Sequence, residues 1–423
     1  MVTLSQAQLQ RIKVIEKVVD GYLKMGQAAE LLNLSRRQVR RLKKRYSAQG
    51  GEWVQHGNQG RRSANRIADV VRQQVLELAG GKYGGFNDTH LQEKLVGQEG
   101  LRLSRASLQR ILRQAGLASP QKRRPPRYRS RRERRAQEGT MLQADGSRHD
   151  WLEGRGPYLT LLGFQDDATG KVPVARFQEE AEDGVGYLRL LRQQVEEVGI
   201  PLSLYRDQHG VFQRNDEHWS VAEQLQGQQF PTQVGRALEE LGIVSIPARS
   251  PQAKGRIERL WRTFQDRLRS ELRLAGASTL EQGNAILERF LIQHNAQFAR
   301  PPRQTGRAYR PLDRRLDLAY IFSLRYERTV NPDHTVAALP GCPVQLPCLP
   351  GRRGYAGKKV QVCQQPNGDL RIYLDRRLLH VQAAPADASP VRAQRMNRRA
   401  APRKKKPIRI YTYAGRAARA PRF

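Results

Sequence analysis

The spacing of apolar residues along the chain changes once, near residue 140. Before that point apolar residues recur every three to four positions, which predicts amphipathic helices. After it, short apolar runs typical of strands alternate with helical stretches. In chain order we predict strands at 141–147, 158–170 and 171–177, a helix at 182–198, a strand at 200–207, a helix at 234–241, a strand at 243–248 and a long helix from about Pro251.

This β-β-β-α-β-α-β-α order is the ribonuclease-H-like arrangement, in which antiparallel hairpins come first and parallel crossovers follow. It predicts an α/β core over residues 141–300. Asp145 would lie on the first strand, Asp207 at the carboxyl end of the fourth, and Glu258 on the helix after the fifth. Because open α/β sheets place ligands at the carboxyl ends of their strands, we expect these distant acids to meet.

A helix-turn-helix is predicted near the N-terminus, within residues 1–60. An apolar stripe (Ala28, Ala29, Leu31, Leu32) precedes a turn at Asn33-Leu34, and Ser35 is a suitable N-cap for a second helix with Val39 and Leu42 inward. That second helix carries Arg36, Arg37, Arg40, Arg41 and Lys43. A basic second helix after a tight turn is typical of DNA recognition. The alternative is a basic amphipathic helix on a solvated surface.

Residues 61–117 repeat this pattern, with a helix that begins after Ser104 and leaves Arg105 and Arg110 outside. We predict a second helix-turn-helix-like domain, with a packing module for the core as the alternative. Residues 118–140 form a basic, proline-containing linker that should be extended. It would follow a phosphate backbone or serve as a solubilising hinge.

The C-terminal part changes character twice. Residues 301–388 predict a helical connector and then alternating strands, with a hairpin turn at Asn367-Gly368, which we interpret as a small β-barrel. Residues 389–423 contain many basic residues and no acid, so we expect a disordered tail that orders on a polyanion.

Charge identifies the class of partner. The chain of 423 residues has 75 Lys and Arg against 40 Asp and Glu, a net charge of +35. Such a balance argues for double-stranded DNA or another polyanion. No signal peptide or membrane span is expected, which predicts a cytoplasmic, nucleoid-associated protein.

Asp145, Asp207 and Glu258 are the candidate catalytic and metal-binding residues. Each carboxylate lies in apolar or glycine-flanked sequence, where an unpaired charge is costly, and a divalent metal would explain all three. Lys254 and Arg262 share a helical face with Glu258 and are candidate DNA contacts, although an ion pair between Lys254 and Glu258 is the alternative. Only these three acids fit strand ends and a helix face together, and the rival acids are Asp150, Asp166, Asp167, Asp216 and Glu217.

Five segments, QADGSRHDW, LLGFQDDATG, RDQHGVF, RALEELGI and SPQAKGRIERLWRTFQDRL, resemble conserved blocks of ISNCY-type insertion-sequence transposases, relatives of the retroviral integrases. The resemblance implies a DDE recombinase that binds terminal inverted repeats and catalyses cleavage and strand transfer. It implies Asp145, Asp207 and Glu258 as the triad and Mg²⁺ as cofactor, with Mn²⁺ as a substitute and no ATP. Gln208-His209 departs from the usual asparagine after the second acid.

Transposition joins two DNA ends, so we expect weak self-association of the free protein and a dimer or higher oligomer on DNA. Two other functions remain open from the sequence. One is a sequence-specific DNA-binding regulator without enzymatic activity, which the acidic triad disfavours. The other is a ribonuclease-H-like nuclease that cuts without joining, which the tandem recognition units disfavour.

Overall fold

The computed structural model describes residues 5–50, 54, 66–120, 132–214, 217, 219–248, 254–339, 341–347, 354–385 and 391–393. It contains two compact units, Met1–Leu76 and Glu77–Phe423, and each is described by itself. The predicted helix start at Pro251, the rival acid Asp216, residues 121–131 of the linker and residues 394–423 of the tail lie outside the described residues.

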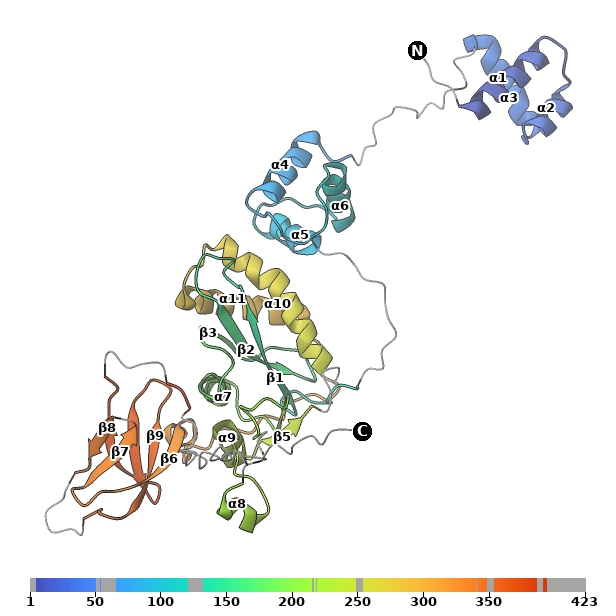
Figure 1. The fold of residues 1–423 in the computed structure, drawn as a ribbon. Coiled ribbons are helices and arrows are strands. Elements are labelled where there is room, and N and C mark those ends of the chain that lie inside the picture. Colours follow the sequence, from blue (N-terminus) through green and yellow to red (C-terminus); the bar gives the residue numbers. More distant parts are fainter. Residues whose placement is uncertain are drawn as a thin grey trace, which may run out of the picture. The chain divides into compact units, whose positions relative to one another are not determined.

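The first unit contains the predicted helix-turn-helix (Figure 1). Its helices are α1 (Gln6–Val19), α2 (Met25–Leu31) and α3 (Arg36–Gln49). Ser35 caps α3 as expected, since its hydroxyl accepts from the backbone N–H of Gln38 and the Gln38 side chain accepts in return. Val39 packs against Ala28 and Ala29, whereas Leu31 is 59% exposed, so its predicted place in the core is wrong.

Three further helices follow: α4 (Asp69–Gly80), α5 (Asp88–Gly97) and α6 (Arg105–Gln114). Asn87 caps α5 through the backbone N–H groups of Thr89 and His90. Ser104 caps α6 as predicted, by accepting from the backbone N–H of Ser107. Three apolar residues of α6 are buried: Leu108, Ile111 and Leu112.

A mixed sheet forms the centre of the second unit. Its strands are β1 (Leu142–His149), β2 (Leu159–Asp166), β3 (Ala175–Gln178), β4 (Ser203–Arg206) and β5 (Val244–Pro247), in the order β3-β2-β1-β4-β5. The β1-β2-β3 pairs are antiparallel, and β4 runs parallel to β1 and β5. The predicted antiparallel hairpins followed by parallel strands are therefore confirmed, although β1 continues beyond residue 147 to His149.

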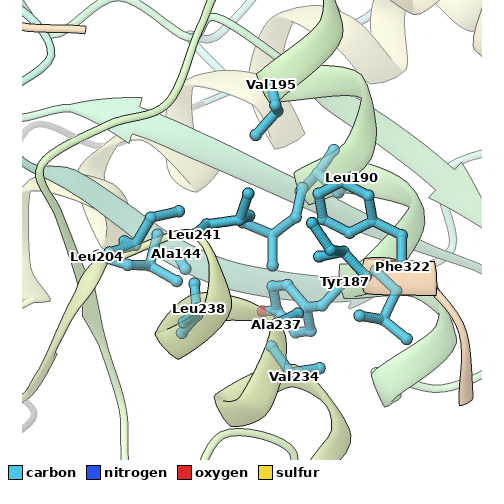
Figure 2. Packing of buried hydrophobic residues seen from close by; sticks show 14 of the residues in the cluster. Ala144, Tyr187, Leu190, Val195, Leu204, Val234, Ala237, Leu238, Leu241 and Phe322 are labelled. Carbon is cyan, nitrogen blue, oxygen red and sulfur yellow. The ribbon is translucent and has the colours of Figure 1, made fainter. Parts of the chain in front are cut away.

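Helices cover both faces of this sheet (Figure 1). They are α7 (Gly184–Glu197), α9 (Gln233–Glu240), α10 (Gly255–Leu274) and α11 (Leu280–Phe298), whereas the short α8 (Val221–Gln226) has its apolar residues exposed. Even-numbered residues of β2, such as Leu162, share a core with α7 and α9 (Figure 2), whereas odd-numbered ones, such as Leu161, share a second core with α10 and α11. This division follows from the alternation of side chains along a strand.

The C-terminal region comprises α12 (Leu318–Ile321), β6 (Leu324–Thr329), β7 (Thr335–Leu339), β8 (Cys342–Gln345), β9 (Lys359–Gln364), β10 (Leu370–Leu374) and β11 (Arg377–Gln382). The strands form a four-stranded sheet, β11-β10-β9-β6, and a two-stranded sheet, β7-β8, around one small core. A closed barrel is thus not confirmed within the described part of this region. The hairpin turn between β9 and β10 contains Gly368 at φ 97°, as expected for its Asn-Gly sequence.

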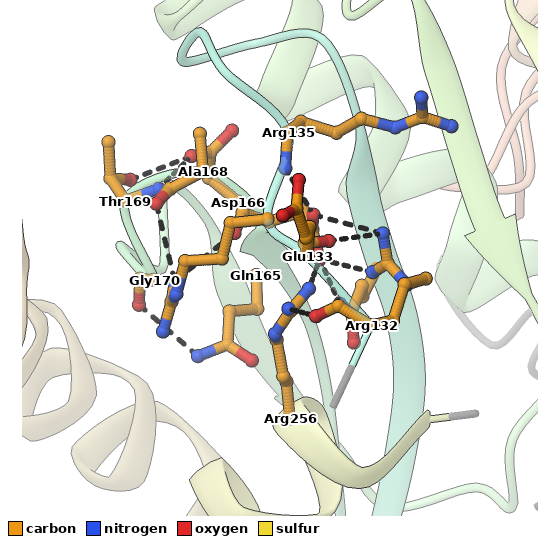
Figure 3. A network of polar contacts seen from close by, with 12 residues as sticks. Arg132, Glu133, Arg135, Gln165, Asp166, Ala168, Thr169, Gly170 and Arg256 are labelled. Atoms are coloured by element: carbon orange, nitrogen blue, oxygen red, sulfur yellow. Dashed lines mark hydrogen bonds and ion pairs between the residues drawn. The ribbon is translucent and has the colours of Figure 1, made fainter. Parts of the chain in front are cut away.

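Part of the predicted linker is bound to the core (Figure 3). Arg132 forms an ion pair with Asp167, whose side chain is fully buried, and Arg256 of α10 pairs with the same carboxylate. The backbone N–H of Gly139 donates to Asp166 at 2.9 Å. Burial alone would raise the pKa of Asp167, but the hydrogen bond from Arg132 and further cationic contacts hold it below its usual range. Residues 132–140 of the predicted linker therefore pack on the core.

Candidate active site

Asp145 and Asp207 lie side by side on neighbouring parallel strands. The register of β1 and β4 pairs Leu142 with Leu204 and Gln143 with Tyr205. Continued by two residues, this register brings Asp145 to the level of Asp207, which directly follows β4. The side chains are 18% and 39% exposed, respectively, so both carboxylates are open to solvent on one side.

A lysine ammonium lies between these two carboxylates. Lys254 Nζ is 2.6 Å from Asp145 Oδ1 and 3.5 Å from Asp207 Oδ2, and the lysine side chain is only 8% exposed. The other oxygen of Asp145 accepts a hydrogen bond from Trp261 Nε1 at 2.9 Å. Both Lys254 and Trp261 come from the beginning of α10, so this helix orients Asp145.

Glu258 is placed differently from the other two predicted acids. It lies in the first turn of α10, four residues after Lys254, and its side chain is exposed. Lys254 pairs with the aspartates, and the described ion pairs include none between Lys254 and Glu258. Among the described residues, no three His, Cys, Asp or Glu side chains lie close enough to hold a metal ion. The structure therefore brings together two of the three predicted acids.

Three of the rival acids, Asp150, Asp166 and Asp167, form hydrogen bonds or ion pairs that stabilise the fold. Asp166 accepts from the backbone N–H and the hydroxyl of Thr169, both at 2.7 Å, and so closes the turn after β2. Asp167 holds the arginines of Figure 3. Asp150 accepts from the backbone N–H of Gly154 at 3.1 Å. These hydrogen bonds explain the three aspartates without a catalytic role.

Sequence reasoning missed a further acid, Glu182, in the segment between β3 and α7. Its Oε1 accepts a hydrogen bond from the hydroxyl of Tyr187 at 2.7 Å. Burial raises the pKa of Glu182, the bond from Tyr187 opposes this, and the charges of Asp207 and Asp145 raise it further. The chain has acids at 179, 180, 182 and 183, and nothing in that run distinguishes the one on which the aspartates act.

The candidate DNA contacts are of three kinds. Exposed side chains that fit the prediction are Arg36, Arg37, Arg40 and Arg41 on α3, Arg105 and Arg110 on α6, and Arg262 on α10. Lys43 instead donates to the carbonyl of Val18 at 3.2 Å and stabilises its own unit. Lys254 is buried and pairs with the two aspartates.

Helix α5 is bound to α10 through charged side chains. Glu271 of α10 accepts from His90 and Lys94 of α5, each at 2.7 Å, and Arg267 pairs with Glu93 at the same distance. Burial alone would raise the pKa of Glu271, but the hydrogen bonds from His90 and Lys94 outweigh it and lower the pKa. Helix α5 therefore packs against the core, as in the alternative prediction for residues 61–117. Helix α6 has exposed arginines.

Comparison with known proteins agrees with the helix-turn-helix in the first unit. Residues 10–62 match a family described as a helix-turn-helix domain. No described helix is long and apolar enough to cross a bilayer. A solved structure, the catalytic core domain of BIV integrase, aligns at 16% identity and a TM-score of 0.25 over 41% of this chain and 90% of that chain. A score this low adds no support for a shared function.

Two curated relatives cover most of the chain. "Putative transposase y4bF" of Sinorhizobium fredii is 40% identical over 88% of this chain and 80% of that protein. "Transposase for insertion sequence IS1202" of Streptococcus pneumoniae is 28% identical over 87% of this chain and 84% of that protein. At this identity and coverage, with the helix-turn-helix in place, the chain belongs to the insertion-sequence transposases.

Proposed function

We propose that this transposase cuts and joins DNA ends at a divalent-metal site formed by Asp145, Asp207 and Glu258. The observation that carries the proposal is the ammonium of Lys254 held between Asp145 and Asp207. Two carboxylates on adjacent strands repel each other unless a cation lies between them. The lysine therefore marks the position at which the fold stabilises positive charge.

The side chains present fit Mg²⁺ better than a softer metal. The donors are carboxylate oxygens, and Mg²⁺ is usually held by one or two carboxylates together with substrate phosphates. When bound, such a cation would neutralise charge on the phosphodiester and lower the pKa of an attacking water or 3′-hydroxyl. Because DNA would supply the remaining oxygens, a site that is incomplete in the protein alone is expected.

The residues around the site have separate roles in this proposal. Trp261 fixes the orientation of Asp145 through its indole N–H. Lys254 holds the two aspartates close to each other until a divalent cation replaces its ammonium. Glu258 is exposed in the first turn of α10, four residues after Lys254, and is available to a metal that arrives with DNA. Arg262, one turn further along and also exposed, would contact the phosphate backbone.

DNA-end recognition is assigned to α3, with α6 as a second contact. The arginines of α3 are exposed while Val39 is buried, so their side chains are available to DNA if the helix enters a major groove. We infer that α3 reads the terminal inverted repeat. The arginines of α6 would extend the contact along the backbone.

Assembly on DNA follows from the reaction. One site acts on one strand end, so joining two ends requires at least two protomers. The charge of +35 opposes association of the free protein, and DNA phosphates relieve that repulsion. Light scattering should show a dimer or larger oligomer on end DNA, and strand transfer by a monomer on each end would rule this out.

Two substitutions test the catalytic assignment. Asp145→Asn and Glu258→Gln should leave binding to end DNA unchanged and abolish cleavage in Mg²⁺, because each removes a charge without a large change in shape. Asp150→Asn is the matched control, since Asp150 is near in sequence but bonds to Gly154. Normal cleavage by either of the first two variants would contradict the assignment.

A further inference from the structure

We propose that Glu182 is a fourth acidic residue of the active site, whose charge raises the affinity of Asp145 and Asp207 for a divalent cation. This inference rests on the proposed metal site and adds a positioning residue to it. Glu182 immediately precedes the Asp183 N-cap of α7, so it reaches the aspartates from a segment that contributes none of the predicted triad.

Tyr187 fixes one half of the Glu182 carboxylate. The tyrosine is fully buried in the core between the sheet, α7 and α9 (Figure 2), with its ring centroid 4.6 Å from that of Phe212. Its hydroxyl donates to Glu182 Oε1 at 2.7 Å. Because the ring cannot move in a close-packed core, Oε1 is tied to a rigid point, and this hydrogen bond leaves Oε2 unused.

Gly146 shows where Oε2 lies. A Cβ atom added at Gly146 would be 2.6 Å from Glu182 Oε2 and 3.0 Å from its carboxyl carbon. Gly146 directly follows Asp145 on β1, so the Glu182 carboxylate lies against the backbone that carries the first aspartate. A side chain at position 146 would push the carboxylate away, which gives this glycine a reason to be there.

The charges argue against a purely structural role. Glutamine would accept the same hydrogen bond from Tyr187 without repulsion from Asp145 and Asp207, whose charges act on Glu182. A third carboxylate at this point costs stability unless a cation offsets it. Lys254 supplies one ammonium to Asp145 and Asp207, so the negative charge that Glu182 adds near them is one that a divalent cation would offset.

The test measures metal binding rather than catalysis. Full-length protein, free of metal and DNA, is melted over a range of MnCl₂ concentrations, for the wild type and for Glu182→Gln. The variant should need roughly tenfold more Mn²⁺ for half of the maximal rise in melting temperature, the usual effect of losing a group that supports metal ligands. Without metal it should melt at or above the wild-type temperature, because the repulsion is gone. Glu179→Gln, which removes the same charge at an exposed position, should follow the wild type.

Two outcomes overturn the inference: a Glu182→Gln titration that superimposes on the wild type, or an equal displacement in Glu179→Gln. Tyr187→Phe keeps the ring and releases Oε1, so it should shift the titration in the same direction. If Glu182→Gln does not fold, Tyr187→Phe serves as the test in its place. A Tyr187→Phe titration identical to that of the wild type would then contradict the proposed role of Glu182. Asp145→Asn separates the two proposals: if it abolishes the Mn²⁺ response while Glu182→Gln does not alter it, only the role of Glu182 fails.

Discussion

Lys254 donates to Asp145 across 2.6 Å, although the two residues are 109 positions apart in the chain. The pair joins the first turn of α10 to the central strand of the sheet, and Asp207 lies 3.5 Å from the same ammonium. A protein cation thus occupies the place we assign to a metal. Metal binding and the position of Lys254 should therefore be coupled.

Replacing Lys254 with methionine tests this coupling. Without metal, the variant should lose about 1–3 kcal/mol of unfolding free energy, because two carboxylates lose their charged partner. With metal it should recover, and half-maximal stabilisation by Mn²⁺ should occur at a lower concentration than in the wild type. Arg262→Met, which removes an exposed cation from the same helix, is the control. An unchanged or weaker Mn²⁺ response in Lys254→Met would contradict the model of a competing lysine.

Trp261→Phe tests the orientation of Asp145. Phenylalanine keeps most of the packing in the α10 core and loses the N–H that donates to Asp145 Oδ2. We expect cleavage of end DNA to slow about tenfold, which corresponds to about 1.4 kcal/mol in the barrier. Trp151→Phe is a matched control, because its indole donates to the carbonyl of Ser147 instead. Equal slowing in both variants would mean that the effect is one of packing.

Arg40→Ala on α3 should weaken binding to the inverted repeat. If Arg40 contacts a phosphate, the slope of log affinity against log salt should fall by about one unit. If it contacts a base edge, discrimination against scrambled DNA should fall instead. Lys13→Ala removes an exposed cation from α1 of the same unit, and fluorescence anisotropy should show near wild-type binding for it. A loss shared by both variants would point to net charge rather than to α3.

Glu271→Gln should loosen α5 from α10 in a pH-dependent way. The folded-state pKa of Glu271 is lowered, so its stabilisation is present above the ordinary carboxyl range, about pH 4.3, and is lost as pH falls through the folded-state value. Near neutral pH we expect a loss of about 1–3 kcal/mol in unfolding free energy. The difference from the wild type should shrink below about pH 4.

Chemical denaturation at several pH values measures this difference directly. Glu288→Gln, an exposed acid on α11, is the control and should show a small effect at every pH. Hydrogen exchange should also become faster in α5 of Glu271→Gln near neutral pH. A stability difference that stays constant between pH 7 and about pH 3 would mean that charge at Glu271 does not hold the two helices together.

The sequence alone determined the features that depend on neighbours in the chain. The change of apolar spacing near residue 140 predicted which segments form strands and which form helices, because alternation and helical period are local properties. Ser35 and Ser104 predicted helix starts for the same reason. A similar signal, Ser220 followed by Glu223, marks the start of α8, a helix that we did not predict.

Only the tertiary structure decided which side chains meet. Lys254 pairs with Asp145 rather than with its helical neighbour Glu258, and Glu182 lies against Gly146. Lys43 donates a hydrogen bond to Val18 within its own unit, whereas the neighbouring Arg40 is exposed. Each of these outcomes depends on strand register and helix packing between segments that are distant in sequence. Apolar periodicity does not specify them, because it tells which face of an element is buried but not which charged group lies opposite.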